Sequence, residues 1–167
     1  LFYYEGTVWY KKGFDCNVKK GKRYFVYFGA VNYKADVYLN GQKLGTHVGG
    51  FTPFSFEVSS LLKSTNNFLI IKVDNKRSKD AVPTLNTDWW NYGGITRDVL
   101  LIEEPAAFIQ HYSIQLKKGN NKTITGYVQM NNAASGEIVS ISIPALNVKN
   151  KLVIDATGLA VFDFEVD

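Results

Sequence analysis

The chain has 167 residues, of which 46% are hydrophobic and 14% are aromatic. This composition excludes a disordered chain, and the length allows one β-sandwich of ordinary size or one and a half small ones. The formal net charge is +4, and the positive excess lies entirely in residues 1–104 as scattered lysines and arginines. A nucleic-acid binder would show a denser basic stripe, and a membrane protein a long apolar run, so neither partner is expected.

The single cysteine, Cys16, excludes an intrachain disulfide. Folding therefore does not require an oxidising compartment, although secretion without disulfides is equally compatible with the sequence. The chain starts with Leu1-Phe2-Tyr3, without a methionine or a signal peptide, so a targeting segment could have been removed. The location is left open between a bacterial periplasmic or secreted protein and a cytoplasmic one.

Short alternating runs dominate the first part of the chain, and helical periodicity is nearly absent. The clearest local signal is Asn40-Gly41, the preferred pair for a two-residue type I′ turn, in which both central residues need a positive φ. It predicts a hairpin. The strands predicted here cover residues 6–12, 23–29, 35–39, 42–45, 49–58, 68–73 and 99–102.

A domain boundary is expected at Pro105, where the aromatic density of the chain drops. The remainder has the pattern of a second sandwich, and about five strands are predicted in it. That number falls short of the seven that are usual for an immunoglobulin-like sandwich, so the second unit is expected to be incomplete. These strands cover residues 108–117, 123–131, 137–143, 151–155 and 159–166.

Spacing reveals no catalytic constellation: the metalloprotease, serine hydrolase, P-loop and dinucleotide motifs are all missing. Glu103 and Glu104 are neighbours at a strand, so they point to opposite faces and cannot form the facing pair that glycoside cleavage requires. With two histidines and one cysteine, a transition-metal site is not expected.

The segment 87–95 combines aromatic rings with a carboxylate and an amide, after a long charged loop over residues 74–87. Rings can cover the apolar C–H face of a sugar, while Asp88 and Asn91 accept hydrogen bonds from neighbouring hydroxyls. The alternative is that Trp89, Trp90 and Tyr92 are core rings, with at least one tryptophan buried. The residue types alone leave both interpretations open.

Several segments, taken in order, resemble glycoside hydrolase family 2, which includes β-galactosidases and β-glucuronidases. Residues 6–12 look like the family's G-x-x-W-Y-[KR]-[KR] strand, and residues 28–41, continued by 45–54, look like its F-x-G-V-x-x-x-A-x-V-x-[LV]-N-G stretch. Residues 88–99 are similar to the signature D-[FW]-x-N-x-[AG]-G-I-x-R-x-V. Residues 106–167 resemble the family's next domain, which is immunoglobulin-like, only in their pattern of short predicted strands and in their position in the chain.

The resemblance implies an all-β chain. It implies a jelly-roll, galactose-binding-like β-sandwich over residues 1–104, with its N-terminal strands partly missing. An incomplete immunoglobulin-like β-sandwich, truncated at its C-terminal end, would follow over residues 105–167. The implied function is that of a non-catalytic, sugar-binding accessory region of a retaining β-glycosidase that hydrolyses terminal β-glycosides. The family's two catalytic glutamates lie on a (β/α)₈ barrel that this chain lacks, so the chain alone is expected to be inactive.

The family's signature aspartate falls on Asp88, which is expected to contact the sugar directly or through a bound cation of the full enzyme. Trp90 and Asn91 are expected to shape the same active-site mouth, while Arg97 and Asp98 hold the loop to the sandwich. No catalytic residue, resident metal or cofactor is expected in the chain itself.

The expected partners are a carbohydrate, namely a terminal β-galactoside or a related sugar, and the missing catalytic barrel. A homodimer formed through exposed strand edges is also expected. Two other classes of function stay open beside the accessory role: a free-standing carbohydrate-binding module and a structural scaffold sandwich.

Overall fold

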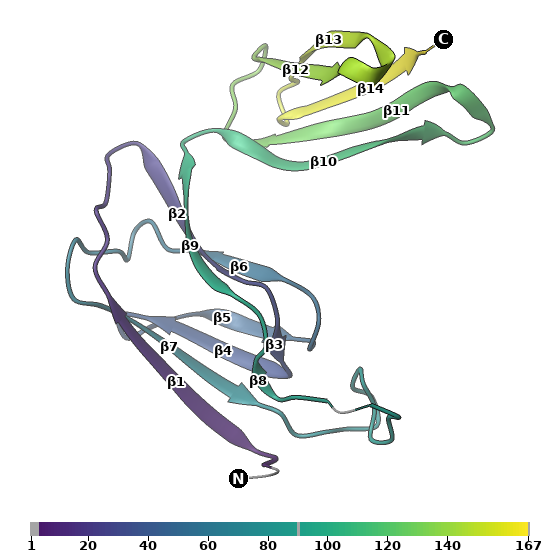
Figure 1. Ribbon diagram of the computed structural model, residues 1–167. Helices are drawn as coiled ribbons and strands as arrows, with labels where there is room; N and C mark the ends of the chain where they lie inside the picture. Colours follow the sequence, from purple (N-terminus) through teal and green to yellow (C-terminus); the bar gives the residue numbers. More distant parts are fainter. Residues whose placement is uncertain (1–3, 90, 167) are drawn as a thin grey trace. The chain divides into compact units, whose positions relative to one another are not determined.

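The computed structural model describes residues 4–89 and 91–166, and the chain divides into two compact units, Leu1–Glu104 and Pro105–Asp167 (Figure 1). In the described residues every regular element is a β-strand except one short 3₁₀ helix, Pro144–Leu146. The all-β prediction is confirmed. The jelly-roll and immunoglobulin-like topologies of the two units stay predictions.

The first unit contains two main sheets and one short ribbon (Figure 1). The larger sheet has four antiparallel strands in the order β1 (Thr7–Phe14), β7 (Asn67–Asp74), β4 (Lys34–Leu39) and β5 (Gln42–Val48). The smaller sheet has the order β6 (Phe54–Glu57), β2 (Lys22–Phe28) and β9 (Val99–Pro105). The ribbon pairs β3 (Val31–Asn32) with β8 (Gly94–Ile95), and neither of these two-residue strands was predicted from the sequence.

The two main sheets pack face to face over one apolar core, because alternate residues of each strand point inward. The inward residues of β7 alternate strictly with half-buried outward ones. The outward residues of β2, Phe25 and Tyr27, are half-buried, so both faces of this strand are at least partly covered. The core residues are Tyr24, Val26, Phe28, Val31, Ala35, Val37, Leu39, Val58, Leu69, Ile71 and Val73.

The predicted hairpin is confirmed between β4 and β5. Its two central residues have positive φ, 52° at Asn40 and 88° at Gly41. The Asn40 side chain also ties the turn to the next segment, because its Nδ2 donates to the Leu61 carbonyl at 2.8 Å and to Asn67 Oδ1 at 3.0 Å. Asn67 is 2% exposed, and its Nδ2 donates to the Lys63 carbonyl at 2.6 Å.

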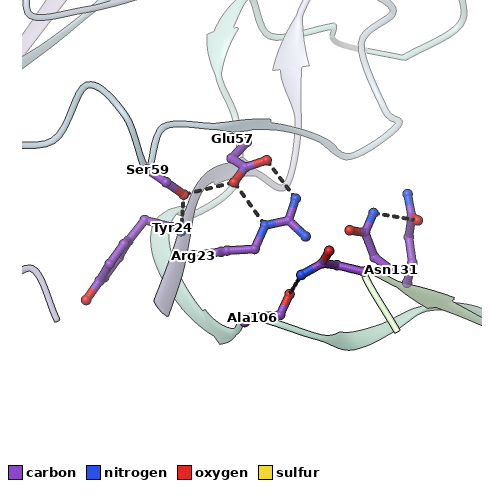
Figure 2. Close-up of polar contacts among 8 residues, drawn as sticks. Arg23, Tyr24, Glu57, Ser59, Ala106 and Asn131 are labelled. Atoms are coloured by element: carbon purple, nitrogen blue, oxygen red, sulfur yellow. Dashed lines mark hydrogen bonds and ion pairs between the residues drawn. The ribbon is translucent and has the colours of Figure 1, made fainter. Parts of the chain in front are cut away.

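The strand predicted over residues 49–58 is shorter than expected, since only Phe54–Glu57 forms β6. Pro53, which has no amide hydrogen to donate to a ladder, directly precedes it. The guanidinium of Arg23 on β2 donates two hydrogen bonds, of 2.9 and 2.7 Å, to the Glu57 carboxylate on β6 (Figure 2). Ser59 Oγ donates to Glu57 at 2.9 Å and accepts from the Tyr24 amide, so this network fixes β6 against β2 (Figure 2). The Arg23 hydrogen bond lowers the pKa of the Glu57 carboxyl.

An apolar groove of about 470 Å³ opens at one side of the first sandwich, between residues of β1, β7 and β9. Core side chains such as Val26, Leu69 and Ile71 reach its floor. Leu100 and Leu101 of β9 also line it and are 49% and 38% exposed.

The second unit contains a three-stranded sheet and a two-stranded sheet (Figure 1). The first has the order β10 (Phe108–Lys117), β11 (Asn120–Asn131) and β14 (Leu159–Glu165). The second pairs β12 (Ile138–Ile143) with β13 (Val148–Val153). The buried cluster between them is Ile124, Val128, Ile141, Leu152, Ile154, Ala160 and Phe162.

Strand β10 carries a row of apolar side chains that this cluster does not include. Tyr112, Ile114 and Leu116 pair with Val128, Gly126 and Ile124 of β11, so they share the inward side of the sheet. They are nevertheless 68%, 44% and 59% exposed, and β10 has one neighbouring strand among the described strands. Such an edge can pair with another chain, but the homodimer expected from the sequence stays a prediction.

Candidate functional site

The loop between β7 and β8 carries the aromatic segment, and both of its ends are fixed by close backbone contacts. At its start, Asn75 Oδ1 accepts from the Gly6 amide at 2.7 Å, and its Nδ2 donates to the Tyr4 carbonyl at 2.9 Å. At its end, a side chain at Gly93 would collide with Asn75, and one at Gly94 would collide with the Tyr10 hydroxyl. Gly94 also has a φ of 94°, a conformation that favours glycine.

Asn32 on β3 holds the aromatic segment from the sandwich side. Its side chain is 4% exposed, and its Nδ2 donates to Asn91 Oδ1 at 3.0 Å and to the Tyr92 carbonyl at 2.7 Å. A Cβ at Gly50 would come within 2.7 Å of Asn32 Oδ1, so a larger residue there would displace the Asn32 side chain. Asn32 therefore positions Asn91 and the backbone after it.

Two shallow pockets lie at this segment, and Phe51 and Trp89 line both. The first has a volume of about 220 Å³, and Asn32, Asn91 and Arg97 supply its polar groups. The second has a volume of about 340 Å³, and Asp88 lines it together with residues 81–84, 86 and 87. Asp88 and Asn91 thus face neighbouring pockets around the same pair of rings, an arrangement that offers stacking surfaces beside hydrogen-bonding groups.

The rings of the segment are not core rings where the structure describes them. Trp89 is 61% exposed and Tyr92 is 69% exposed, so the core interpretation is wrong for these two residues. Asp88 is exposed and Asn91 is half-buried. Trp90, the third residue expected to shape the mouth, lies outside the described residues.

Arg97 and Asp98 follow the segment and lie against β2. The Gly29 amide donates to the Asp98 carbonyl at 2.9 Å, while Arg97 reaches the rim of the smaller pocket. Asn32, Gly50 and Phe51 were not singled out from the sequence as site residues. The one available signal was the amide of Asn32 directly after the apolar and small residues 28–31, since a polar side chain that becomes buried needs an internal partner.

His47 on β5 supports the turn that carries Gly50 and Phe51. Its ring stacks on Phe54 with 4.0 Å between centroids, and its Nε2 lies 3.2 Å from Thr52 Oγ1. Burial lowers the pKa of the His47 imidazole, although a backbone hydrogen bond at Gly49 acts in the opposite direction.

The first unit should therefore lose stability when the pH falls below about 6.5, the ordinary histidine value. In the unfolded chain His47 binds a proton in that range, whereas the folded chain resists it, so protonation favours unfolding. Urea titrations at pH 7.5 and 5.5, followed by tryptophan fluorescence, measure the change. In the His47→Gln variant the drop should be smaller; an equal drop would assign it to other groups.

The described residues do not by themselves form a cation site at Asp88. No group of three or more histidine, cysteine or acidic side chains is placed to hold a metal ion within residues 4–89 and 91–166. A cation at Asp88 would need ligands from elsewhere, and no step below depends on one. In the same described ranges, no helix is long and apolar enough to cross a membrane.

Comparison with known families decides the assignment. The model of "Glycosyl hydrolases family 2, sugar binding domain" matches residues 2–105. The chain belongs to glycosyl hydrolase family 2. The resemblance inferred from the sequence motifs is confirmed, and the matched family 2 domain contains every described residue of the two pockets.

The family 2 relatives are much longer than this chain. A β-glucuronidase of Formosa agariphila is 40% identical over 106 residues, which are 59% of this chain and 11% of the relative. A β-galactosidase of Thermoanaerobacter pseudethanolicus is 37% identical over 102 residues, 59% of this chain and 14% of the relative. A solved Bifidobacterium dentium β-glucuronidase in complex with coumarin-3-O-glucuronide superposes with a TM-score of 0.81 at 26% identity, over 96% of this chain and 33% of that one.

Proposed function

We propose that this chain is the non-catalytic, sugar-binding accessory region of a retaining β-glycosidase that cleaves terminal β-galactosides or related β-glycosides. In this role the Asp88 loop completes the mouth of an active site whose two glutamates lie on a catalytic barrel outside this chain. The observation that carries the proposal is the grouping of Asp88, Trp89 and Asn91 around two adjoining pockets in a family 2 sugar-binding domain.

The geometry supports the accessory role better than independent catalysis. Asp88 and Asn91 are a carboxylate and an amide, whereas glycoside hydrolysis needs two carboxyl groups facing each other across the bond to be cleaved. The loop is also anchored at both ends by Asn75 and Asn32, so it can present its side chains in a fixed place to a sugar bound by another domain. The named β-glucuronidase and β-galactosidase relatives support β-glycosides as the substrate class of the parent protein.

Activity on nitrophenyl β-galactoside and nitrophenyl β-glucuronide tests the proposal. The assay compares the 167-residue chain alone with a longer protein in which the same chain is joined to a family 2 catalytic barrel. Activity only in the longer protein supports the accessory role. Saturable sugar binding by the short chain, with no activity in either protein, supports a free-standing carbohydrate-binding module instead. Neither activity nor binding supports a scaffold sandwich.

Replacing Asp88 with alanine in the longer protein should lower kcat/KM by about 10- to 100-fold, because a hydrogen bond to a charged group contributes about 1.5–3 kcal/mol. The matched control is Asp80→Ala, which removes another exposed aspartate from the same loop outside both pockets. Its activity should stay within about twofold of the unchanged protein. Equal losses in the two variants would assign the effect to the loop and not to Asp88.

A further inference from the structure

The outer face of the β1-β7-β4-β5 sheet carries an aromatic platform that the Asp88 loop does not use. Trp9 on β1 is 60% exposed, and its ring stacks with Tyr38 on β4 at 6.4 Å between centroids and 30° between planes. Strand β7 lies between β1 and β4 (Figure 1), so the contact between the Trp9 and Tyr38 rings spans the middle strand of the three. Tyr38 is half-buried, so the Trp9 ring is the more open part of this aromatic pair. We call this surface the Trp9 face.

Lysines surround the Trp9 face on several strands. The Lys72 ammonium lies 5.8 Å from the Trp9 ring centroid, and the Lys43 ammonium lies 5.9 Å from the Tyr38 centroid. The Lys11 ammonium lies 5.6 Å from the Phe68 ring centroid. Lys11 is two residues after Trp9 on β1, so both side chains lie on the same side of the strand. Lys34 is on the same side of β4, because it alternates with the buried Ala35.

Of the aspartates on this face, Asp36 pairs with a lysine and Asp74 bonds to a backbone amide. Asp36 accepts hydrogen bonds from Lys43 at 2.7 Å and from Thr46 Oγ1 at 2.5 Å, and the Lys43 bond lowers the pKa of its carboxyl. Asp74 accepts from the Lys76 amide at 3.0 Å. In the described part of the chain Lys11, Lys34 and Lys72 form no ion pair, so their charge is available to an anion.

We propose that the Trp9 face binds an acidic polysaccharide, with the apolar faces of successive sugars on Trp9 and Tyr38 and their carboxylates on the surrounding lysines. The exposed ring of Trp9 can cover the C–H face of a pyranose, and ring stacking adds hydrophobic area to the contact. Charge complementarity favours a uronate chain over a neutral one. The lysines are spread singly around the rings and not in the dense stripe of a nucleic-acid site.

Isothermal titration of the 167-residue chain with oligogalacturonides tests the proposal, with neutral cello-oligosaccharides and polyglutamate as comparison probes. The expected dissociation constant for oligogalacturonides lies between about 1 μM and 1 mM. Trp9→Ala should weaken binding by about tenfold or more without changing its salt dependence. Lys11→Gln combined with Lys34→Gln should weaken binding about tenfold and flatten its dependence on salt.

The control variants remove matching groups from the second unit. Tyr112→Ala removes an exposed ring, and Lys149→Gln with Lys151→Gln removes two exposed lysines. Both should bind within about twofold of the unchanged chain. Asp88→Ala should also bind normally, so the outcome is independent of the role proposed for the loop.

Three results would each overturn the proposal. The first is no saturable binding of oligogalacturonides. The second is equal binding of the neutral oligosaccharide, which would remove the role of the lysines. The third is equal binding of polyglutamate together with unchanged affinity in Trp9→Ala, which would show attraction to any polyanion. Thermal unfolding of every variant verifies that the first unit is folded.

Discussion

Replacing Asn67 with alanine is expected to lower the free energy of unfolding of the first unit by about 3 kcal/mol. The Asn67 side chain is 2% exposed, and Oδ1 accepts both from the Lys63 amide at 2.9 Å and from Asn40 Nδ2 at 3.0 Å. Its Nδ2 also donates to the Lys63 carbonyl. The substitution removes these partners inside the protein, and an unsatisfied buried polar group costs about 1–3 kcal/mol.

Urea unfolding followed by tryptophan fluorescence measures this loss. All three tryptophans lie in residues 1–104, so the signal reports the first unit by itself. The control is Asn66→Gly, which replaces the exposed asparagine directly before Asn67. The backbone of residue 66 has a φ of 57°, which glycine adopts without strain. That variant should stay within about 1 kcal/mol of the unchanged chain. A similar loss in both variants would mean that the turn, and not the buried amide, provides the stability.

Replacing Gly94 with alanine should also destabilise the first unit by about 3 kcal/mol, and it should displace the aromatic segment. The residue is buried with a φ of 94°, which costs an L-residue about 1–2 kcal/mol. The new Cβ would also collide with the Tyr10 hydroxyl, and overpacking costs about 1–3 kcal/mol. Because β8 pairs with β3, the strain falls on the same strand that presents Asn32 to Asn91.

Two further variants separate these causes. Gly41→Ala has a similar φ of 88° with no atom within 4 Å of the added carbon, so it should cost only the backbone part, about 1–2 kcal/mol. Tyr10→Phe in the Gly94→Ala background removes the colliding oxygen and should recover part of the loss. If Gly94→Ala costs no more than Gly41→Ala, the collision with Tyr10 contributes nothing.

The sequence predicted the strands well where local chemistry determines them. Asn40-Gly41 fixed one hairpin because two consecutive positive φ values are accessible to few residue pairs. Strand β10 was predicted at residues 108–117, its bounds in the structure, and the second unit has the five strands expected. The strand predicted over residues 68–73 lies within β7, Asn67–Asp74. The strand predicted over residues 49–58 formed only at Phe54–Glu57. The alternation of side chains could not predict this, because it does not indicate which backbone segments find a partner strand.

The candidate site was predicted only in part. Aromatic, carboxylate and amide side chains in one segment indicated Asp88 and Asn91, and both line pockets in the structure. Asn32 and Phe51 could not be inferred, since they reach the segment through the fold and not by spacing; Asn32 lies 59 residues before its partner Asn91. The exposure of Trp89 and Tyr92 could not be predicted either, because it depends on which other parts of the fold cover the loop. The Trp9 face arises from cross-strand register and was equally hidden.

The uncovered row on β10 also bears on how the chain behaves in a concentrated solution. Among the described strands, Tyr112, Ile114 and Leu116 lie along an edge strand, so an apolar stripe and a sheet edge occur at the same place. Colloidal solubility should then be limited by this one strand, although the net charge of +4 works against association. A lysine in place of Ile114 would act as a gatekeeper, and it would raise the concentration at which the protein begins to precipitate.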